Sequence, residues 1–253
     1  MKIIEVKGKQ IEIYDSIDEL PIKRFHKFNK YMLVDSGIGS DLNDINEHIV
    51  KISRYIDKLD KVNAKVELEN LRQSLYLISE GVNVKHLSFM PLIKSINGKE
   101  VTDISDEGMK KLLNYFETLE LNFFNRLIQS VKKKIEDELD IYFPGRFDDS
   151  PVKEYYDKLK HRTLLELDEI IRKKDNSDLI EKVDYYLLSL AKPKVFSGKE
   201  SAEIKFDKQF EEMCLFLIKE LSMNMDNTTV LQFYNAFDYF KKINKPNGKS
   251  NKL

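Results

Sequence analysis

The segment MLVDSGIGSD, residues 32–41, contains the residues whose types and spacing come closest to catalytic chemistry. An apolar run leads into Asp35, and Ser36 and Gly37 follow it, as where a strand delivers an aspartate into a glycine turn. In a hydrolase with an Asp–His–Ser triad, such an aspartate holds a histidine base, which activates a serine that faces an oxyanion hole. The segment therefore raises the question whether the chain is a serine hydrolase.

The rest of the chain lacks the partners that a subtilisin-like triad needs. No serine stands in the required glycine-rich setting, and glycine follows none of the four histidines, which are His26, His48, His86 and His161. The residues before Asp35 predict a helix rather than the strand that the motif requires. We predict instead that Gly37 ends one helix and that Ser40 or Asp41 caps the next.

The same segment could hold a phosphate, because Gly37-Ile38-Gly39-Ser40 precedes a predicted helix whose N–H groups point outward. It lacks the Gly-Lys-Ser/Thr ending of a phosphate-binding loop and the parallel strand before it. Asp41 and Asp44 would also repel a phosphate group. No phosphate or cofactor site is predicted.

Metal ligands must converge, as histidine pairs four residues apart or carboxylates at fixed loop spacings do. The histidines are scattered one per segment, and the acidic runs 136–138 and 148–149 adjoin lysines or loops. The single cysteine, Cys214, lies in an apolar helical run and is predicted to be a buried thiol in a reducing compartment. We therefore predict no catalytic, cofactor-binding or metal-binding residues and expect that the chain is not an enzyme.

The composition is that of a globular protein with a heavily charged surface: of 253 residues, 42% are hydrophobic and 34% charged. Forty-two Lys and Arg against forty-three Asp and Glu give a formal charge of -1, so no global basic field attracts nucleic acid or anionic lipid. There is neither a secretory signal nor a run of membrane-spanning length. The expected location is the cytoplasm of the cell that makes the chain.

Two local features bear on nucleic acid. Lys132–Lys134 and the lysine-rich C-terminus could contact phosphates, and aromatic and basic residues interleave between 23 and 31. On a helical wheel these aromatic and basic residues mostly separate onto different faces, as in an ordinary amphipathic helix. Direct nucleic-acid binding is therefore not the expected function, and a non-specific contact with DNA stays open.

The elements that must position these residues are mostly helices. Residues 3–14 alternate around Gly8, which predicts a short β-hairpin, and a helix is predicted from Pro21 to about Val34. Residues 82–104 are irregular, and Asn97-Gly98 fits either a type I′ hairpin turn or a helix C-cap. Ser105 is predicted to cap a helix, and a further apolar pattern runs to Leu139.

The clearest periodic signal is a heptad pattern between residues 42 and 80, which contain no glycine or proline. The apolar positions shift in phase near Asp60 and are Leu42, Ile45, Ile49, Ile52, Ile56, Leu59, Ala64, Leu68, Leu71, Leu75 and Ile78. We predict one long helix with a phase shift, ending at Gly81, in preference to a helical hairpin that turns near Asp60.

The sequence predicts a mainly α fold, a helical bundle with one long helix and small β-hairpin elements. A break at 143–147 suggests an N-terminal domain of residues 1–145, with the β-hairpin and the long helix, and a C-terminal helical region of residues 146–243. Four helices are predicted there, the first opening at Pro151 and the second covering Ser177 to about Leu190. Residues 244–253 are predicted to be a flexible basic tail.

The stretch ELPIKRFHKFNKYMLVDSGIGSDLNDI, residues 19–45, resembles ring proteins of crAss-like bacteriophages, and the rest of the chain is similar in its Lys/Asn/Ile-rich style. This resemblance implies a structural virion protein without catalytic residues. It implies a multi-copy homo-oligomeric ring with twelvefold symmetry, a head-to-tail connector in the neck or tail. It also implies the portal protein and other neck and tail proteins as partners, and assembly in the host cytoplasm around the path of DNA exit.

Two other functions remain open. The stretch FMPLIKSINGKEVTDISDEGMKKLL, residues 89–113, also resembles phage tail-assembly chaperones, which act during morphogenesis and are not retained in the virion. An enzyme with an unrecognised site would require a polar cleft in which titratable residues converge. Presence in the mature virion distinguishes the ring protein from the chaperone.

Overall fold

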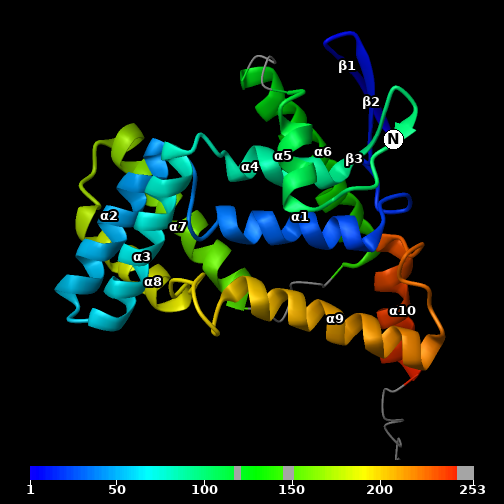
Figure 1. Ribbon diagram of the computed structural model, residues 1–253. Helices are drawn as coiled ribbons and strands as arrows, with labels where there is room; N and C mark the ends of the chain where they lie inside the picture. Colours follow the sequence, from blue (N-terminus) through cyan, green and yellow to red (C-terminus); the bar gives the residue numbers. More distant parts are fainter. Residues whose placement is uncertain (117–120, 145–150, 244–253) are drawn as a thin grey trace, which may run out of the picture. The chain divides into compact units, whose positions relative to one another are not determined.

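The computed structural model describes residues 1–116, 121–144 and 151–243, and Figure 1 shows its helices and strands. Within this part of the chain there are ten α-helices and a four-stranded antiparallel sheet, which confirms the mainly α fold with small β-hairpins. The elements are β1 (Lys2–Val6), β2 (Lys9–Ile13), α1 (Ile22–Asp35), α2 (Leu42–Asp57), α3 (Lys61–Ser79), α4 (Val84–Phe89), the 3₁₀ helix η1 (Met90–Leu92), β3 (Ile93–Ile96), β4 (Lys99–Glu100), α5 (Asp106–Leu113), α6 (Leu121–Tyr142), α7 (Pro151–Arg172), α8 (Ser177–Leu190), α9 (Ala202–Leu221) and α10 (Val230–Ile243).

The chain forms two compact units built from interleaved segments. Unit 1 contains residues 1–32, 85–141 and 205–253, and unit 2 contains residues 33–84 and 142–204. The predicted boundary at residue 145 and the predicted tail, residues 244–253, lie outside the described residues. The division of the chain at residue 145 stays a prediction.

The sheet of unit 1 consists of two hairpins, with strand order β1-β2-β3-β4. Lys7 and Gly8 both have positive φ, and so do Asn97 and Gly98, as type I′ turns require. The predicted N-terminal hairpin is confirmed, and Asn97-Gly98 is a hairpin turn rather than a helix C-cap. β2 and β3 join the two hairpins, with Ile11 opposite Ile96.

The core of unit 1 is apolar and rich in aromatic side chains. The rings of Phe89, Phe116 and Phe124 pack against one another, with Phe116 and Phe124 stacked at 5.1 Å between centroids. The buried guanidinium of Arg24 donates hydrogen bonds of 3.0 Å to the carbonyl oxygens of Pro91 and Ile93, and a third to that of Val101. Each buried carbonyl thus has a donor, and the charge is spread over several acceptors.

Unit 2 contains α2 and α3 as an antiparallel helical hairpin, so the prediction of one long helix from residue 42 to 80 was wrong (Figure 1). The chain reverses at Leu59, which has φ of 59°, and the Asp60 side chain accepts a hydrogen bond from the N–H of Asn63 to cap α3. The phase shift near Asp60 marks this turn. Folding back lets the two helices pack against each other through the half-buried positions of the stripes.

The second half of the chain has the four predicted helices. α7 begins at Pro151 and α8 covers Ser177–Leu190, which confirms both predicted starts. In the first half, the Ser105 hydroxyl accepts a hydrogen bond from the N–H of Gly108 and caps α5 as predicted. Helix starts and caps of this kind depend on residues close together in the sequence, which is why the sequence alone predicts them.

Leu59→Gly tests the helical turn. A non-glycine residue in the left-handed conformation costs about 1 kcal/mol, and the Leu59 side chain is 83% exposed, so little packing is lost. We expect the free energy of unfolding, measured by urea denaturation, to rise by up to about 1 kcal/mol. In a continuous helix the same change would lower it by about 1 kcal/mol. Leu59→Ala, which keeps the strained backbone, serves as the control and should give no gain.

Candidate functional site

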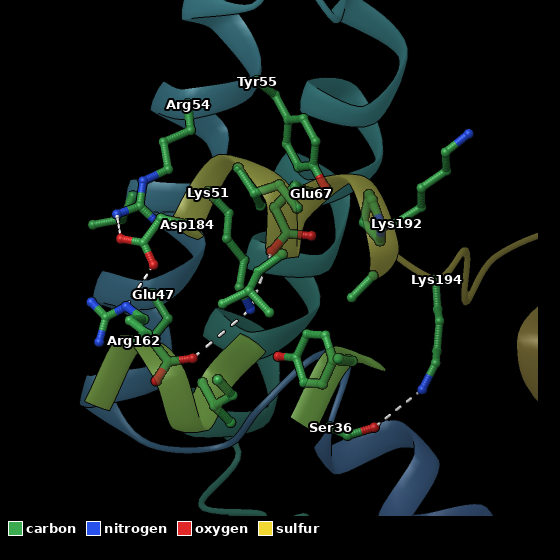
Figure 2. A pocket seen from close by; sticks show the side chains of 18 of the residues that line it. Ser36, Glu47, Lys51, Arg54, Tyr55, Glu67, Arg162, Asp184, Lys192 and Lys194 are labelled. Atoms are coloured by element: carbon green, nitrogen blue, oxygen red, sulfur yellow. Dashed lines mark hydrogen bonds and ion pairs between the residues drawn. The ribbon is translucent and has the colours of Figure 1, made fainter. Parts of the chain in front are cut away.

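The candidate site is a pocket of about 720 Å³ within unit 2 (Figure 2). α2, α3, α7, α8 and residues 191–194 line it, together with Ser36 and Gly37 at the end of α1. Its charged lining residues are Glu47, Lys51, Arg54, Glu67, Arg162, Asp184, Lys192 and Lys194. It is a cleft in which titratable residues converge, as an unrecognised enzyme would require.

Most of these charges pair with one another. Asp184 is buried between two guanidinium groups, 2.6 Å from Arg54 Nη2 and 2.5 Å from Arg162 Nε (Figure 2). Arg162 also lies 2.6 Å from Glu166, one helical turn further along α7. Both arginines are thereby held in place, and each carboxylate oxygen of Asp184 accepts a hydrogen bond from one of them.

Lys51, Lys194 and Tyr55 are further polar side chains of the pocket. Lys51 Nζ lies 3.8 Å from Glu47 and 3.9 Å from Glu67. Lys194 Nζ lies 3.4 Å from the hydroxyl of Ser36. Burial, together with the negative charges of Glu67 and Asp60, raises the pKa of Tyr55 to about 12, so its hydroxyl stays protonated and does not act as a base.

Behind the pocket, Glu67, His48 and Ser74 are arranged in the order of a catalytic triad. His48 Nδ1 lies 2.9 Å from Glu67 Oε1, and Nε2 lies 3.2 Å from Ser74 Oγ. However, both Nε2 and the Ser74 hydroxyl donate to the carbonyl oxygen of Ile38. A nitrogen that donates a proton there cannot accept one from serine, and Ser74 is fully buried. The group fastens the segment after α1 to the hairpin.

Both ring nitrogens of His48 face hydrogen-bond acceptors, Glu67 Oε1 and the carbonyl oxygen of Ile38, which favours the protonated imidazole. Burial lowers its pKa, but the hydrogen bonds to Glu67 and to Ile38, with the charge of Glu67, outweigh burial and place the pKa above the ordinary 6.5. His48 and Glu67 therefore form an ion pair that is almost completely buried, with side chains 4% and 3% exposed. Breaking such a pair costs more than making it gains, because the remaining charge is left without a partner.

The segment that opened the question of a hydrolase is a helix junction, as predicted. α1 ends at Asp35, and the Asp41 side chain caps α2 by accepting hydrogen bonds from the N–H groups of Asn43 and Asp44. The Asp44 carboxylate accepts from the N–H of Asp41 in return, so the two form a capping box. The Asp35 region therefore supplies no catalytic aspartate to the triad-like group.

The other histidines and the cysteine are in separate places. His26 lies 2.9 Å from Asp207 and stacks on Phe206 and Phe210, and His86 lies 3.0 Å from Asn125. His161 is exposed on α7. Cys214 is buried as predicted, and burial raises the pKa of its thiol. Within the described residues, no group of three or more His, Cys, Asp or Glu side chains converges as a metal site would require.

Sequence analysis missed both the pocket and the buried polar group. Arg54, Arg162 and Asp184 lie in three different helices, and no spacing in the sequence relates them. The one available signal was that polar residues recur at heptad positions next to the apolar stripe, as His48, Glu67 and Ser74 do. That signal also fits an ordinary solvated face.

Searches with family models, among curated proteins and among solved structures gave no match to this chain. No helix in the described part of the chain has the length and apolar character needed to cross a membrane.

The His48–Glu67 pair predicts a pH dependence of stability. Because the pKa of His48 is raised on folding, its contribution is fully present below the unfolded pKa of about 6.5 and is lost as the pH rises through the folded pKa. We expect the free energy of unfolding, from urea titrations between pH 6 and pH 9, to fall across this range. In Glu67→Gln the part of this fall that comes from His48 should disappear, with a loss of about 3 kcal/mol at pH 6.

His161→Gln is the control, because this histidine is exposed on α7 and its loss should leave the pH profile unchanged. A Glu67→Gln profile that parallels the unmodified protein would show that the pair is not charged in the folded state.

Proposed function

We propose that this chain is a structural protein of a tailed bacteriophage that assembles in multiple copies as a ring near the portal and has no catalytic activity of its own. The observation that carries the proposal is the placement of apolar side chains. Large apolar side chains on several helices are exposed to solvent. By contrast, Asp184 pairs with two arginines, and Glu67 pairs with His48. A chain of this kind acts through contacts with other proteins.

The exposed apolar side chains occur in both units. Single exposed hydrophobic residues are normal, but several of these share one helix face. Side chains at least 50% exposed include Leu42, Ile49 and Ile56 on α2, Tyr76 on α3, Tyr156, Leu164, Ile170 and Ile171 on α7, Leu215 on α9, and Tyr239 and Ile243 on α10. A ring subunit needs several such surfaces, because it contacts two neighbours and the rings above and below it.

The pocket supports the same conclusion from the chemical side. Asp184 is saturated by Arg54 and Arg162, and the triad-like serine Ser74 has no access to solvent. These groups stabilise unit 2, and neither Asp184 nor Ser74 is available as a base or nucleophile. The specific placement in the virion neck and the portal as partner rest on the resemblance of residues 19–45.

The test is the assembly state of the purified protein, alone and with the portal protein from the same source. We expect light scattering to give a mass several-fold above 29.8 kDa, and negative-stain electron microscopy to show closed rings, in at least one of the two samples. Mass spectrometry of purified particles should detect the chain.

A monomer that ignores the portal and is absent from particles would overturn the proposal and favour the assembly chaperone.

A further inference from the structure

In the α2–α3 hairpin most buried side chains are polar and part of the apolar stripe is exposed, which is the reverse of an ordinary amphipathic helix pair. Its buried side chains are His48 and Tyr55 on α2 and Glu67, Asn70 and Ser74 on α3, of which four are polar or charged. Its heptad stripe lies next to this polar side on each helix, and part of the stripe is exposed. The exposed stripe positions are Leu42, Ile49, Ile56, Leu68 and Leu75, with exposed fractions of 72%, 51%, 59%, 42% and 48%.

The other stripe positions, Ile45, Ile52, Ala64, Leu71 and Ile78, are half-buried, as expected where α2 and α3 pack together. The exposed and half-buried positions together form a two-helix apolar layer, which we call the outer face of the hairpin. The polar inner side explains the inversion. The Asn70 side chain donates to the carbonyl oxygen of Lys194, and the Lys58 amine donates to that of Tyr185. The helices thus attach to the rest of unit 2 by polar contacts.

Unit 2 also has few buried apolar side chains of its own. The buried apolar side chains of unit 2 are Val34, Ile38, Tyr55, Val84, Phe143, Leu187 and Leu188. By contrast, the twelve largest fully buried side chains in the described part of the chain all lie in unit 1. Burial of apolar area is the main favourable contribution to folding. An additional layer on the outer face would therefore supply what unit 2 lacks.

A second unpartnered apolar stripe lies on α7 of the same unit. Tyr156, Leu164, Leu167, Ile170 and Ile171 fall within one side of the helix at 100° per residue, and their exposed fractions are 62%, 54%, 45%, 75% and 75%. We call this set the α7 stripe. A single helix with such a stripe fits the groove between two antiparallel helices, as ridges fit grooves in helix packing.

The two surfaces match in size. The exposed fractions add up to about three complete side chains on each, or on the order of 300 Å² of apolar area per surface. The apolar part of a small to standard protein interface is roughly 350–450 Å² per partner, and the half-buried positions add to the outer face. Charged residues adjoin both surfaces: Lys65 and Arg72 lie beside the outer face, Asp157 lies beside the α7 stripe, and Lys153 and Lys160 lie within that stripe at 100° per residue. Asp157 is the acidic side chain of this set that can attract Lys65 or Arg72 at the rim.

We infer that the outer face of the α2–α3 hairpin in one copy binds the α7 stripe of the next copy, head to tail. This inference rests on the proposed function, since it names the surfaces by which copies of the chain associate. Contacts between two different patches give rings when the rotation closes, whereas a contact of one patch with itself stops at a dimer. Two different apolar surfaces on one unit are what a ring subunit requires.

The experiment uses two variants of the full chain, each with one surface disrupted. Ile49→Lys with Leu75→Lys disrupts the outer face, and Leu167→Lys with Ile170→Lys disrupts the α7 stripe. All four residues are at least 45% exposed, so folding should be retained, which circular dichroism checks. Leu215→Lys with Ile218→Lys on α9 of unit 1 is the control, because these residues are 64% and 45% exposed.

Light scattering should give 29.8 kDa for each variant alone and twice that mass for their equimolar mixture, because each retains the surface that the other lacks. The control should keep the mass of the unmodified protein, which exceeds that of a monomer. A monomeric unmodified protein at every concentration overturns the inference, and so do variants that keep the unmodified mass. If only the outer-face variant becomes monomeric and the mixture does not pair, the outer face binds itself and the α7 assignment is wrong.

Hydrogen exchange of the unmodified protein gives a second measurement that needs no variant. Residues 42–79 and 153–172 should both gain protection as the concentration rises, and unchanged exchange in either segment contradicts the inference. If the chain is found in phage particles but both variants still assemble like the unmodified protein, the inference about the two surfaces is wrong and the proposed function stands. If the mixed variants pair but the chain is absent from particles, the inference about the two surfaces stands and the proposed function is wrong.

Discussion

The buried ion pair of His48 and Glu67 is the constraint on which unit 2 depends. Charges removed from water need partners, and here the Ile38 carbonyl and the Ser74 hydroxyl complete the group. The α2–α3 hairpin therefore has to direct its polar side inward, toward the segment that follows α1. Since the heptad stripe lies next to that polar side, the same orientation leaves the stripe exposed. One local electrostatic requirement thus decides which side of two helices faces outward.

The two units solve the problem of stability differently. Unit 1 has an apolar core with an aromatic cluster, and its buried charge, Arg24, is satisfied by backbone carbonyls that hold η1, β3 and the residue after β4 in place. Unit 2 relies on polar groups instead: Asp184 joins α2, α7 and α8 through Arg54 and Arg162. Such networks specify geometry well but stabilise less than burial of apolar area. This makes unit 2 the part of the chain with most to gain from a partner.

A triad-like arrangement and a polar pocket would ordinarily favour an enzyme. The direction of the hydrogen bonds argues against a serine nucleophile at this triad-like group, because the imidazole of His48 donates on both sides and Ser74 has no solvent access. The arrangement of residues alone does not define a catalytic site; the protonation state and the accessibility decide. The exposed helix faces then carry the functional argument, and they favour assembly.

The sequence by itself determined the local structure: the two hairpin turns, the helix caps at Asp41 and Ser105, and the starts of α7 and α8. These depend on backbone conformation and on contacts within a few residues, so the sequence contains all that is needed. The tertiary structure alone decided that residues 42–79 form a hairpin, that its apolar stripe faces outward, and that Arg54, Arg162 and Asp184 meet in a pocket. The heptad pattern is the same in a long helix and in a hairpin, and only contacts between distant segments distinguish them.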